Sequence, residues 1–419
     1  MLNRKEQPEL VDITSIEFIA PKKHQISEDV VLYHMSEVPN ETSKIELYFN
    51  AGKCTADKGL SSIVNGLLLS GTKDRTSIEI NESINGLGGF YESGVAMENS
   101  AVTIYALREN LIEIFASVQD AIENLAFIEQ EVEQLIADRK QSFKIGLEKV
   151  GTLARRKFQQ ELFASSPRYS SVMSLEHFDE INIDDLKSYH SEYYLNGLQK
   201  VVVVGDLSDE EINRIIQLCK RFTSGSNVEV ESIFDNTKGR MHETKKGAMQ
   251  SALRIGRPLF NKRHEDYLDF IILNTLLGDY FGSRLMSNIR EDKGYTYGIG
   301  SIVAEFKETG YFLIATEVGV DVLEDAISEI RKEIERLQNE LVPEEELSLV
   351  KNYMLGQLLK SADGPYAMTD LFLSAESQEL DIEFYNKAIE NIHRITPERI
   401  KELANKYLNW EDFTIVSAG

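Results

Sequence analysis

The sequence predicts an α+β fold made of two homologous halves, each a mainly antiparallel β-sheet covered by helices. Two observations point to the duplication and one to the layers. Segments of similar pattern recur about 214 residues apart, and a Gly/Ser-rich stretch followed by charged residues lies near the middle of the chain. Pairs of helical patterns separate successive strand-like runs, which favours a sheet covered on one face over a doubly wound parallel sheet.

The first recurring segment begins at Ile181 and again at Ile395. A polar cap residue opens a helical pattern in each copy. Each copy then reaches the tripeptide Tyr-Leu-Asn and an apolar run: 194–196 and 201–204 in the first copy, 407–409 and 413–416 in the second. Both copies therefore predict a capped helix that leads into a β-strand.

A second correspondence has the same spacing. Residues 127–132 align with residues 341–346, and each stretch opens a long helical pattern with acidic residues in its first turn. Carboxylates there interact favourably with the positive end of the helix dipole. Two matches in one register indicate an internal duplication.

The remaining patterns place strands and helices inside this frame. We expect strands at 44–49 and 311–316 and a long amphipathic helix at 322–337. The stretch that starts at Thr223 and stays charged to about Lys246 has the composition of a linker. The predicted boundaries are therefore an N-terminal half at 1–222, a linker at 223–245 and a C-terminal half at 246–419.

Composition excludes several classes of function. The chain has 419 residues, with 45 basic against 69 acidic side chains and a net charge of −24. Such an excess repels phosphate backbones, so we expect no nucleic-acid partner. No apolar run reaches the roughly 18 residues of a membrane span, and residues 1–8 lack the apolar core of a signal peptide. We therefore expect a cytoplasmic protein without a membrane partner.

Residues 59–72 read GLSSIVNGLLLSGT. This stretch resembles the active-site helix of the pitrilysin/insulinase family of zinc peptidases, whose pattern runs G-x-x-H-x-x-E-H-x-x-x-x-G-T. In that register Ser62 and Gly66 stand at the two histidine ligands and Asn65 at the catalytic carboxylate. The family's third ligand, a glutamate far downstream, falls on Ser142. The resemblance covers essentially the whole chain and implies the two-half fold of that family.

Zinc is held by histidine, cysteine or carboxylate donors, and serine, glycine and asparagine do not supply such a set. The seven histidines include no pair three or four residues apart, so no helical turn presents two of them together. We therefore expect no cofactor on this chain. Glu92 also stands where active members carry asparagine on the substrate-binding edge strand, which weakens the expectation that this half binds peptide.

The second half keeps the family's C-terminal signature. Residues 282–297 read GSRLMSNIREDKGYTY and resemble S-R-L followed by I-R-E-x-x-G-x-x-Y, with Arg290 and Tyr297 at the signature arginine and tyrosine. In the family this pair faces the zinc site and holds the substrate near the scissile bond. A guanidinium and a phenol can both donate to a carbonyl oxygen that develops negative charge. The alternative is that Arg290 pairs with a helix carboxylate and Tyr297 packs in a sheet.

Loss of the zinc positions together with retention of the Arg/Tyr pair predicts the non-zinc subunit of a heterodimeric zinc metallopeptidase. The resemblance implies a homologous H-x-x-E-H partner that carries the zinc, and a peptide substrate held by Arg290 and Tyr297. One alternative is a structural or peptide-binding family member without a catalytic role. A stand-alone hydrolase is the other, but the sequence offers no nucleophile and base for it.

Overall fold

The computed structural model describes residues 11–38, 41–56, 59–225 and 235–419. The N-terminal stretch 1–8 and residues 226–234 of the predicted linker lie outside these ranges. The limits of the halves at 1–222 and 246–419 therefore remain predictions. None of the described helices is long and apolar enough to cross a membrane.

The first half builds a six-stranded sheet with the order β1-β2-β6-β3-β5-β4. Its strands are β1 Lys22–Gln25, β2 Val31–Met35, β3 Thr42–Phe49, β4 Phe90–Val95, β5 Ser100–Leu107 and β6 Leu198–Val204. Strands β2 and β6 pair in parallel, and the other neighbours pair antiparallel. The strand expected at 44–49 is thus confirmed as part of β3.

The second half builds a five-stranded sheet with the order β7-β11-β8-β10-β9. Its strands are β7 Gly239–Glu243, β8 Gln250–Leu259, β9 Thr296–Glu305, β10 Gly310–Gly319 and β11 Thr414–Ala418. Strands β7 and β11 are parallel and the other pairs antiparallel, so order and directions repeat those of β2-β6-β3-β5-β4. The predicted α+β duplication is confirmed, with β1 as an addition to the first sheet.

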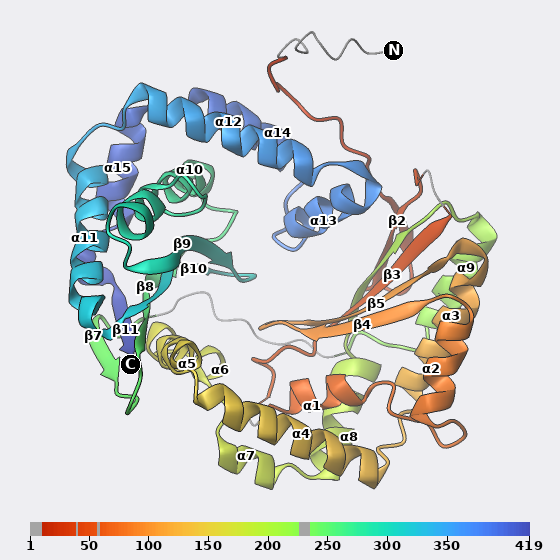
Figure 1. Ribbon diagram of the computed structural model, residues 1–419. Helices are drawn as coiled ribbons and strands as arrows, with labels where there is room; N and C mark the ends of the chain where they lie inside the picture. The colour runs from red at the N-terminus through yellow and green to blue at the C-terminus, as the bar shows by residue number, and fades with distance from the viewer. Residues whose placement is uncertain (1–10, 39–40, 57–58, 226–234) are drawn as a thin grey trace.

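Most helices of the first half cover the outer side of its sheet, whereas those at 150–162 and 167–170 lie beside the second sheet (Figure 1). They are α1 Leu60–Leu67, α2 Ser77–Gly86, α3 Arg108–Glu123, α4 Glu129–Leu147, α5 Val150–Leu162, α6 Pro167–Ser170, α7 Leu175–Glu180, α8 Ile183–His190, the π-helical turn η1 Ser191–Leu195 and α9 Asp209–Cys219. Buried apolar residues of β3, β5 and β6 pack on α1, α3 and α9 to form the core.

Most helices of the second half form a similar outer layer, whereas the helix at 364–376 packs on the first sheet. Its helices are α10 Tyr267–Leu277, the π-helical turn η2 Met286–Asp292, the short turn η3 Val320–Val322, α11 Leu323–Asn339, α12 Glu344–Ser361, α13 Gly364–Glu376, α14 Phe384–Arg394, α15 Pro397–Tyr407 and the short turn η4 Trp410–Asp412. Helix α11 confirms the expected amphipathic helix. Its apolar side packs with α10 and α15 against the second sheet.

The helix starts match the capping signals in the sequence. Asn182 accepts from the amide of Asp185 at the start of α8, and Thr396 accepts from the amide of Arg399 at the start of α15. These side chains satisfy backbone donors that the first helical turn leaves unpaired. Helices α4 and α12 begin at Glu129 and Glu344, as their acidic first turns predict.

One pair of helices is exchanged between the halves. Helix α5 follows the first sheet in the chain but packs on β8 and β11 of the second, and Phe158 belongs to that apolar cluster. Helix α13 packs on the first sheet, where Phe372 meets Tyr33. The spacing between α5 and α13 is that of the sequence repeat. Each half therefore covers part of the other's inner sheet face, and the two halves interlock.

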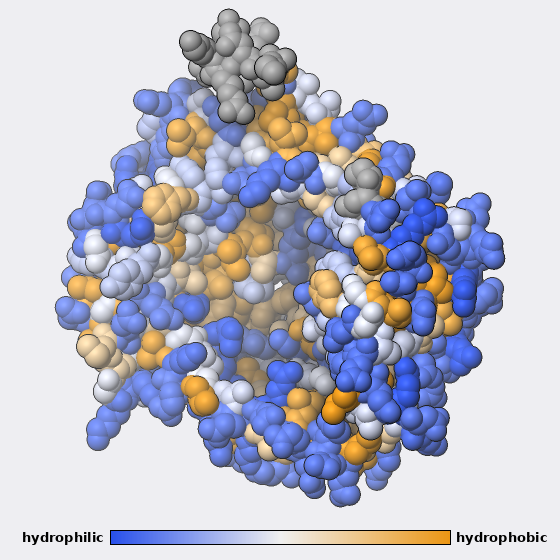
Figure 2. Space-filling model, turned by 45° about the vertical axis from the view of Figure 1, so that its right-hand side comes forward, coloured by the Kyte–Doolittle hydropathy of each residue, from blue (hydrophilic) through white to orange (hydrophobic). Residues whose placement is uncertain are grey.

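Figure 1 shows the inner faces of the two sheets on either side of a central opening. Figure 2 shows this opening as a hollow whose walls carry hydrophobic patches between hydrophilic rims. Polar contacts join the halves beside it. The hydroxyl of Tyr33 donates to Glu376 (3.0 Å), and the amide of Lys307 donates to Glu98 (2.8 Å). Burial raises the pKa of Glu98 above its usual range.

Candidate functional site

On α1, the side chain of Asn65 points into the core of the first half. Asn65, at the position of the catalytic carboxylate, is buried, and its Nδ2 donates to the hydroxyl of Tyr194 at 3.1 Å. Tyr194 is fully buried, and burial raises its pKa to about 12. A neutral amide held by a buried phenol cannot take a proton from water. The chemistry of a general base is therefore absent at this position.

His190 extends this inward-facing group. Its Nε2 lies 2.8 Å from the carbonyl oxygen of Ile122, and its ring stacks on Tyr194 at 6.0 Å between centroids. The side chain is buried, which lowers its pKa to about 4 and keeps it neutral. His190 is thus part of the core behind α1.

Helix α4 occupies the space beside Gly66. A Cβ added there would stand 2.9 Å from a methyl of Leu135 and 3.5 Å from a guanidinium nitrogen of Arg139. A longer side chain at Gly66 would therefore have to displace α4 residues. Ser142 lies one helical turn beyond Arg139 and is exposed, and Ser62 is half-buried. A cation beside these positions also disfavours a metal ion.

These four positions do not fit zinc, because they offer two hydroxyls, one amide and no side chain at Gly66. Within the described residues, no group of three or more histidine, cysteine or acidic side chains is placed to hold a metal. No step of a reaction can be assigned to a metal on this chain. That it binds no cofactor remains an expectation.

Arg290 lies in the last turn of η2 and contacts three groups. Its Nε donates to the main-chain carbonyl of Tyr297 at 3.1 Å. Its guanidinium lies over the ring of Phe281, 4.7 Å from the centroid, and Nη1 is 3.8 Å from a carboxylate oxygen of Glu291. The sequence predicts that Arg290 and Tyr297 act as a pair. In the structure the two residues are in contact through the main-chain carbonyl of Tyr297.

Tyr297 is the second residue of β9, and its side chain is 94% exposed. Gly294, with φ 67°, turns the chain into this strand. The hydroxyl oxygen of Thr296 lies 2.9 Å from the carbonyl oxygen of Gly298 and 2.8 Å from that of Glu317, so its one hydrogen can bond either carbonyl and link the start of β9 to β10. Such exposure contradicts the alternative that Tyr297 packs in the sheet. The phenol is presented by a fixed backbone.

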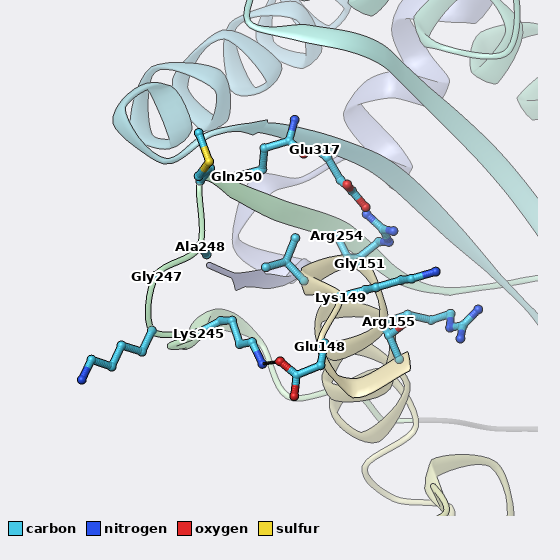
Figure 3. Close-up of a pocket in the computed structure, with 14 residues that line it drawn as sticks. Glu148, Lys149, Gly151, Arg155, Lys245, Gly247, Ala248, Gln250, Arg254 and Glu317 are labelled. Carbon is cyan, nitrogen blue, oxygen red and sulfur yellow. Dashed lines mark hydrogen bonds and ion pairs between the residues drawn. The ribbon is translucent and has the colours of Figure 1, made fainter. Parts of the chain in front are cut away.

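A cavity of about 360 Å³ lies beside Tyr297. Its other lining residues come from the starts of β8 and β9 and from β10: Gln250, Arg254, Thr296, Gly298, Ala315, Thr316 and Glu317. Three of these residues, Gln250, Arg254 and Glu317, also line a larger pocket of about 720 Å³ (Figure 3). No motif in the sequence predicts this pocket. The basic pair 245–246 is its one local signal, and it lies where the predicted linker meets the C-terminal half.

Glu92 lies exposed on β4, the edge strand of the first sheet. Strand β9, which carries Tyr297, is the edge strand of the second sheet. The two halves therefore place the residues of interest on equivalent edges. An open strand edge offers unpaired backbone groups to an extended peptide.

Comparison with known proteins matches both halves to one family. A family model described as insulinase, peptidase family M16, matches residues 31–155, and one described as peptidase M16 inactive domain matches residues 180–354. Together these models span most of the chain.

Curated relatives match the chain at low identity. The uncharacterized zinc protease YmxG of Bacillus subtilis is 24% identical over 59% of this chain and 60% of its own length. The probable inactive metalloprotease YmfF of the same organism is 24% identical over 65% of both chains. The match thus spans under two thirds of these two relatives. The non-peptidase homolog YmxG of Helicobacter pylori is 24% identical over 74% of both chains.

Solved structures share the fold. A peptidase M16 inactive domain from Pseudomonas fluorescens superposes with a TM-score of 0.83 at 21% identity, over 95% of this chain and 98% of that one. A protease from Helicobacter pylori gives a TM-score of 0.83 at 16% identity, over 95% and 100%. The architecture built from the two repeated sheets is therefore the architecture of these proteins.

Proposed function

The chain belongs to the M16, or insulinase, family of peptidases as an inactive-type member, and we propose that it is the non-zinc subunit of a heterodimeric zinc metallopeptidase. Its partner would be a homologous chain with the H-x-x-E-H motif, and its substrate a peptide. A cytoplasmic location is part of the same proposal.

The observation that carries the proposal is a contrast between two positions in the fold. On α1, Asn65 is turned into the core and bonded to Tyr194. On β9, Tyr297 is exposed and Arg290 is fixed behind it. The exposed phenol on this fixed backbone can be reached by a ligand without any rearrangement of the strand. Tyr297 is therefore available to a ligand, whereas Asn65 is not.

The two side chains have a defined task in this proposal. The Tyr297 hydroxyl and the guanidinium nitrogens of Arg290 would donate to carbonyl oxygens of the bound peptide. The partner's zinc would supply the activated water. Donors aimed at a developing oxyanion each lower the barrier by about 2.7–4 kcal/mol. Because Arg290 Nε is bonded to the main chain of Tyr297, only its Nη1 and Nη2 groups remain for substrate.

The test is reconstitution of the pair from separately purified chains. This chain alone should neither bind zinc nor cleave peptides, whereas a mixture with an H-x-x-E-H paralogue from the same source should cleave them. Stoichiometric zinc and peptidase activity in this chain alone would refute the proposal. A partner whose activity is the same with and without this chain would refute it as well.

A structural or peptide-holding role is the second candidate, and one observation favours it. Arg290 already bonds the main chain of Tyr297 and stacks on Phe281, which is a sufficient structural reason to keep it. Under this role the two chains would assemble, but replacement of Tyr297 would leave turnover unchanged.

A further inference from the structure

The larger pocket beside Tyr297, here called the α5 pocket, is built where the two halves meet. One wall is the turn between α4 and α5, residues 148–155, and the other is the β7–β8 turn with the start of β8 and part of β10. Its volume is about 720 Å³. Figure 3 shows the charged ends of Lys149, Arg155 and Arg254 on the same side of the first turn of α5.

The side chains that line the α5 pocket carry a net positive charge, whereas the whole chain is negative. Five cationic side chains line it, against two acidic ones: Lys149, Arg155, Lys245, Lys246 and Arg254, with Glu148 and Glu317. The chain as a whole carries −24. A local positive cluster creates a field that attracts an anion to this place.

Most of these cations lack an acidic partner. Lys245 pairs with Glu148 at 2.5 Å. Across the part of the chain that the structure describes, no carboxylate lies within ion-pair distance of the other four cations. Arg254 is half-buried and donates to main-chain carbonyls, those of Leu253 (2.8 Å) and Thr316 (3.3 Å). Its charge is therefore only partly compensated.

Two of the cations also repel each other. Burial lowers the pKa of Arg254, the Glu317 carboxylate raises it, and the positive charge of Arg155 lowers it by a smaller amount. Arg155 comes from the first half and Arg254 from the second, so the interlocked fold holds like charges together. An anion between them would offset this repulsion.

The Glu317 carboxylate lies against the first turn of α5, where Gly151 leaves room for it. A Cβ added at Gly151 would collide with the carboxylate of Glu317. The N-cap residue of α5, Lys149, makes no side-chain cap hydrogen bond, and the Glu317 carboxylate is the acidic group beside this helix end. The argument for an anion therefore rests on the cationic side chains and not on the helix end.

We propose that the α5 pocket binds a carboxylate of the peptide that Tyr297 contacts, and that it selects acidic peptides. The pocket shares Gln250, Arg254 and Glu317 with the cavity beside Tyr297, so a single extended peptide can reach both. The inference rests on the proposed function only in taking the ligand to be a peptide. The carboxylate belongs either to an acidic side chain or to the C-terminus.

Binding to this chain alone tests the inference. The probe is a fluorescent ten-residue peptide with two glutamates next to a free C-terminus, measured by anisotropy. Replacing the glutamates by glutamine, or amidating the C-terminus, separates the two sources of carboxylate. We expect at least one of these changes to weaken binding tenfold or more, because each removes a charge-assisted hydrogen bond.

The double variant Lys149→Gln with Arg155→Gln should bind the acidic peptide at least tenfold more weakly than the unmodified chain does. Its affinity for the neutral peptide should not change. Both side chains are exposed, so the fold should tolerate the change. Lys246→Gln, on the exposed β7–β8 turn, is a second variant with a smaller loss in the same direction. The matched control is Arg214→Gln with Lys220→Gln on α9, which removes the same charge far from the pocket and should change binding less than twofold.

Four results would overturn the inference, and three of them concern the peptide: no binding at millimolar peptide, equal loss in the control variant, or equal affinity for acidic and neutral peptides. Inorganic phosphate that binds a hundredfold more tightly than the peptide would also overturn it and assign the pocket to phosphate. The peptide-binding assay uses this chain without its partner. Selective binding of the acidic peptide would therefore still support this inference if reconstitution of the pair failed. Successful reconstitution without selective binding would refute only this inference.

Discussion

The α1 region of the first half and the start of β9 in the second half have opposite relations to solvent. On α1, Asn65, Tyr194 and His190 form a buried group that contributes to the core. On β9, Tyr297 stands in solvent on a backbone fixed by Thr296. The difference indicates that the first region now serves stability and that the second is available for binding. Four predictions can break or sharpen this comparison.

The largest effect is expected from the exchanged helices, which couple the two regions. Phe158→Ala on α5 and Phe372→Ala on α13 should each lower the free energy of unfolding by about 3–5 kcal/mol, because each leaves a cavity in a core shared by both halves. Urea denaturation followed by circular dichroism measures this loss. The exposed Ile78→Ala on α2 is the control, with an expected change within about 0.5 kcal/mol.

Because α5 covers the second sheet and α13 covers the first, unfolding of either half would uncover the inner sheet face of the other. We therefore expect each phenylalanine variant to unfold in a single transition. Two separated transitions, with only one half affected by each variant, would contradict the exchange of α5 and α13.

Asn65→Ala should lower the free energy of unfolding by about 1–3 kcal/mol, because it leaves the buried hydroxyl of Tyr194 without this donor. The double variant with Tyr194→Phe should recover part of the loss. A double-mutant cycle by urea denaturation measures the coupling. If the two changes in the free energy of unfolding simply add, Asn65 and Tyr194 do not stabilise the fold through their hydrogen bond.

His190 makes the α1 region sensitive to acid. Its pKa is lowered from 6.5 to about 4, so the folded protein binds fewer protons than the unfolded chain between these values. The contribution of neutral His190 to the free energy of unfolding is complete above pH 6.5 and decreases as the pH falls toward 4. We expect a loss of about 2 kcal/mol between pH 7 and pH 5. Denaturation at the two pH values measures it, and His190→Gln should remove this part of the dependence. An unchanged dependence in that variant would contradict the assignment.

The smallest effect on stability is expected at Tyr297. Tyr297→Phe should change the free energy of unfolding by no more than about 0.5 kcal/mol, because the exposed hydroxyl has no role in the core. The same urea titration measures it beside Asn65→Ala. A loss as large as that of Asn65→Ala would show that Tyr297, too, serves the fold.

Local signals in the sequence predicted the parts of the fold that depend on local interactions. The caps at Asn182 and Thr396 and the acidic first turns at Glu129 and Glu344 mark helix starts within a few residues. The apolar spacing of α5 indicates that one of its faces is buried. It does not say which sheet covers that face, because both sheets offer similar apolar surfaces, so the helix exchange was not predictable.

The candidate site was predictable only where a motif spans it. Arg290 and Tyr297 lie in one continuous signature, and the structure brings them together. The inward turn of Asn65 depends on Tyr194, which lies 129 residues away in the sequence. Arg155 and Arg254 meet only because the halves interlock. Such pairs arise from tertiary packing and leave no local trace in the sequence.

The central claim is that Tyr297 acts on substrate while the α1 region does not, and one measurement tests it directly. It is the kcat/KM of the reconstituted pair with Tyr297→Phe in this chain, beside Tyr295→Phe as the matched loss of a hydroxyl. The account predicts a loss of about 10²–10³ for Tyr297→Phe with unchanged assembly, and little change for Tyr295→Phe. Equal kcat/KM for the two variants and the wild-type pair would contradict it.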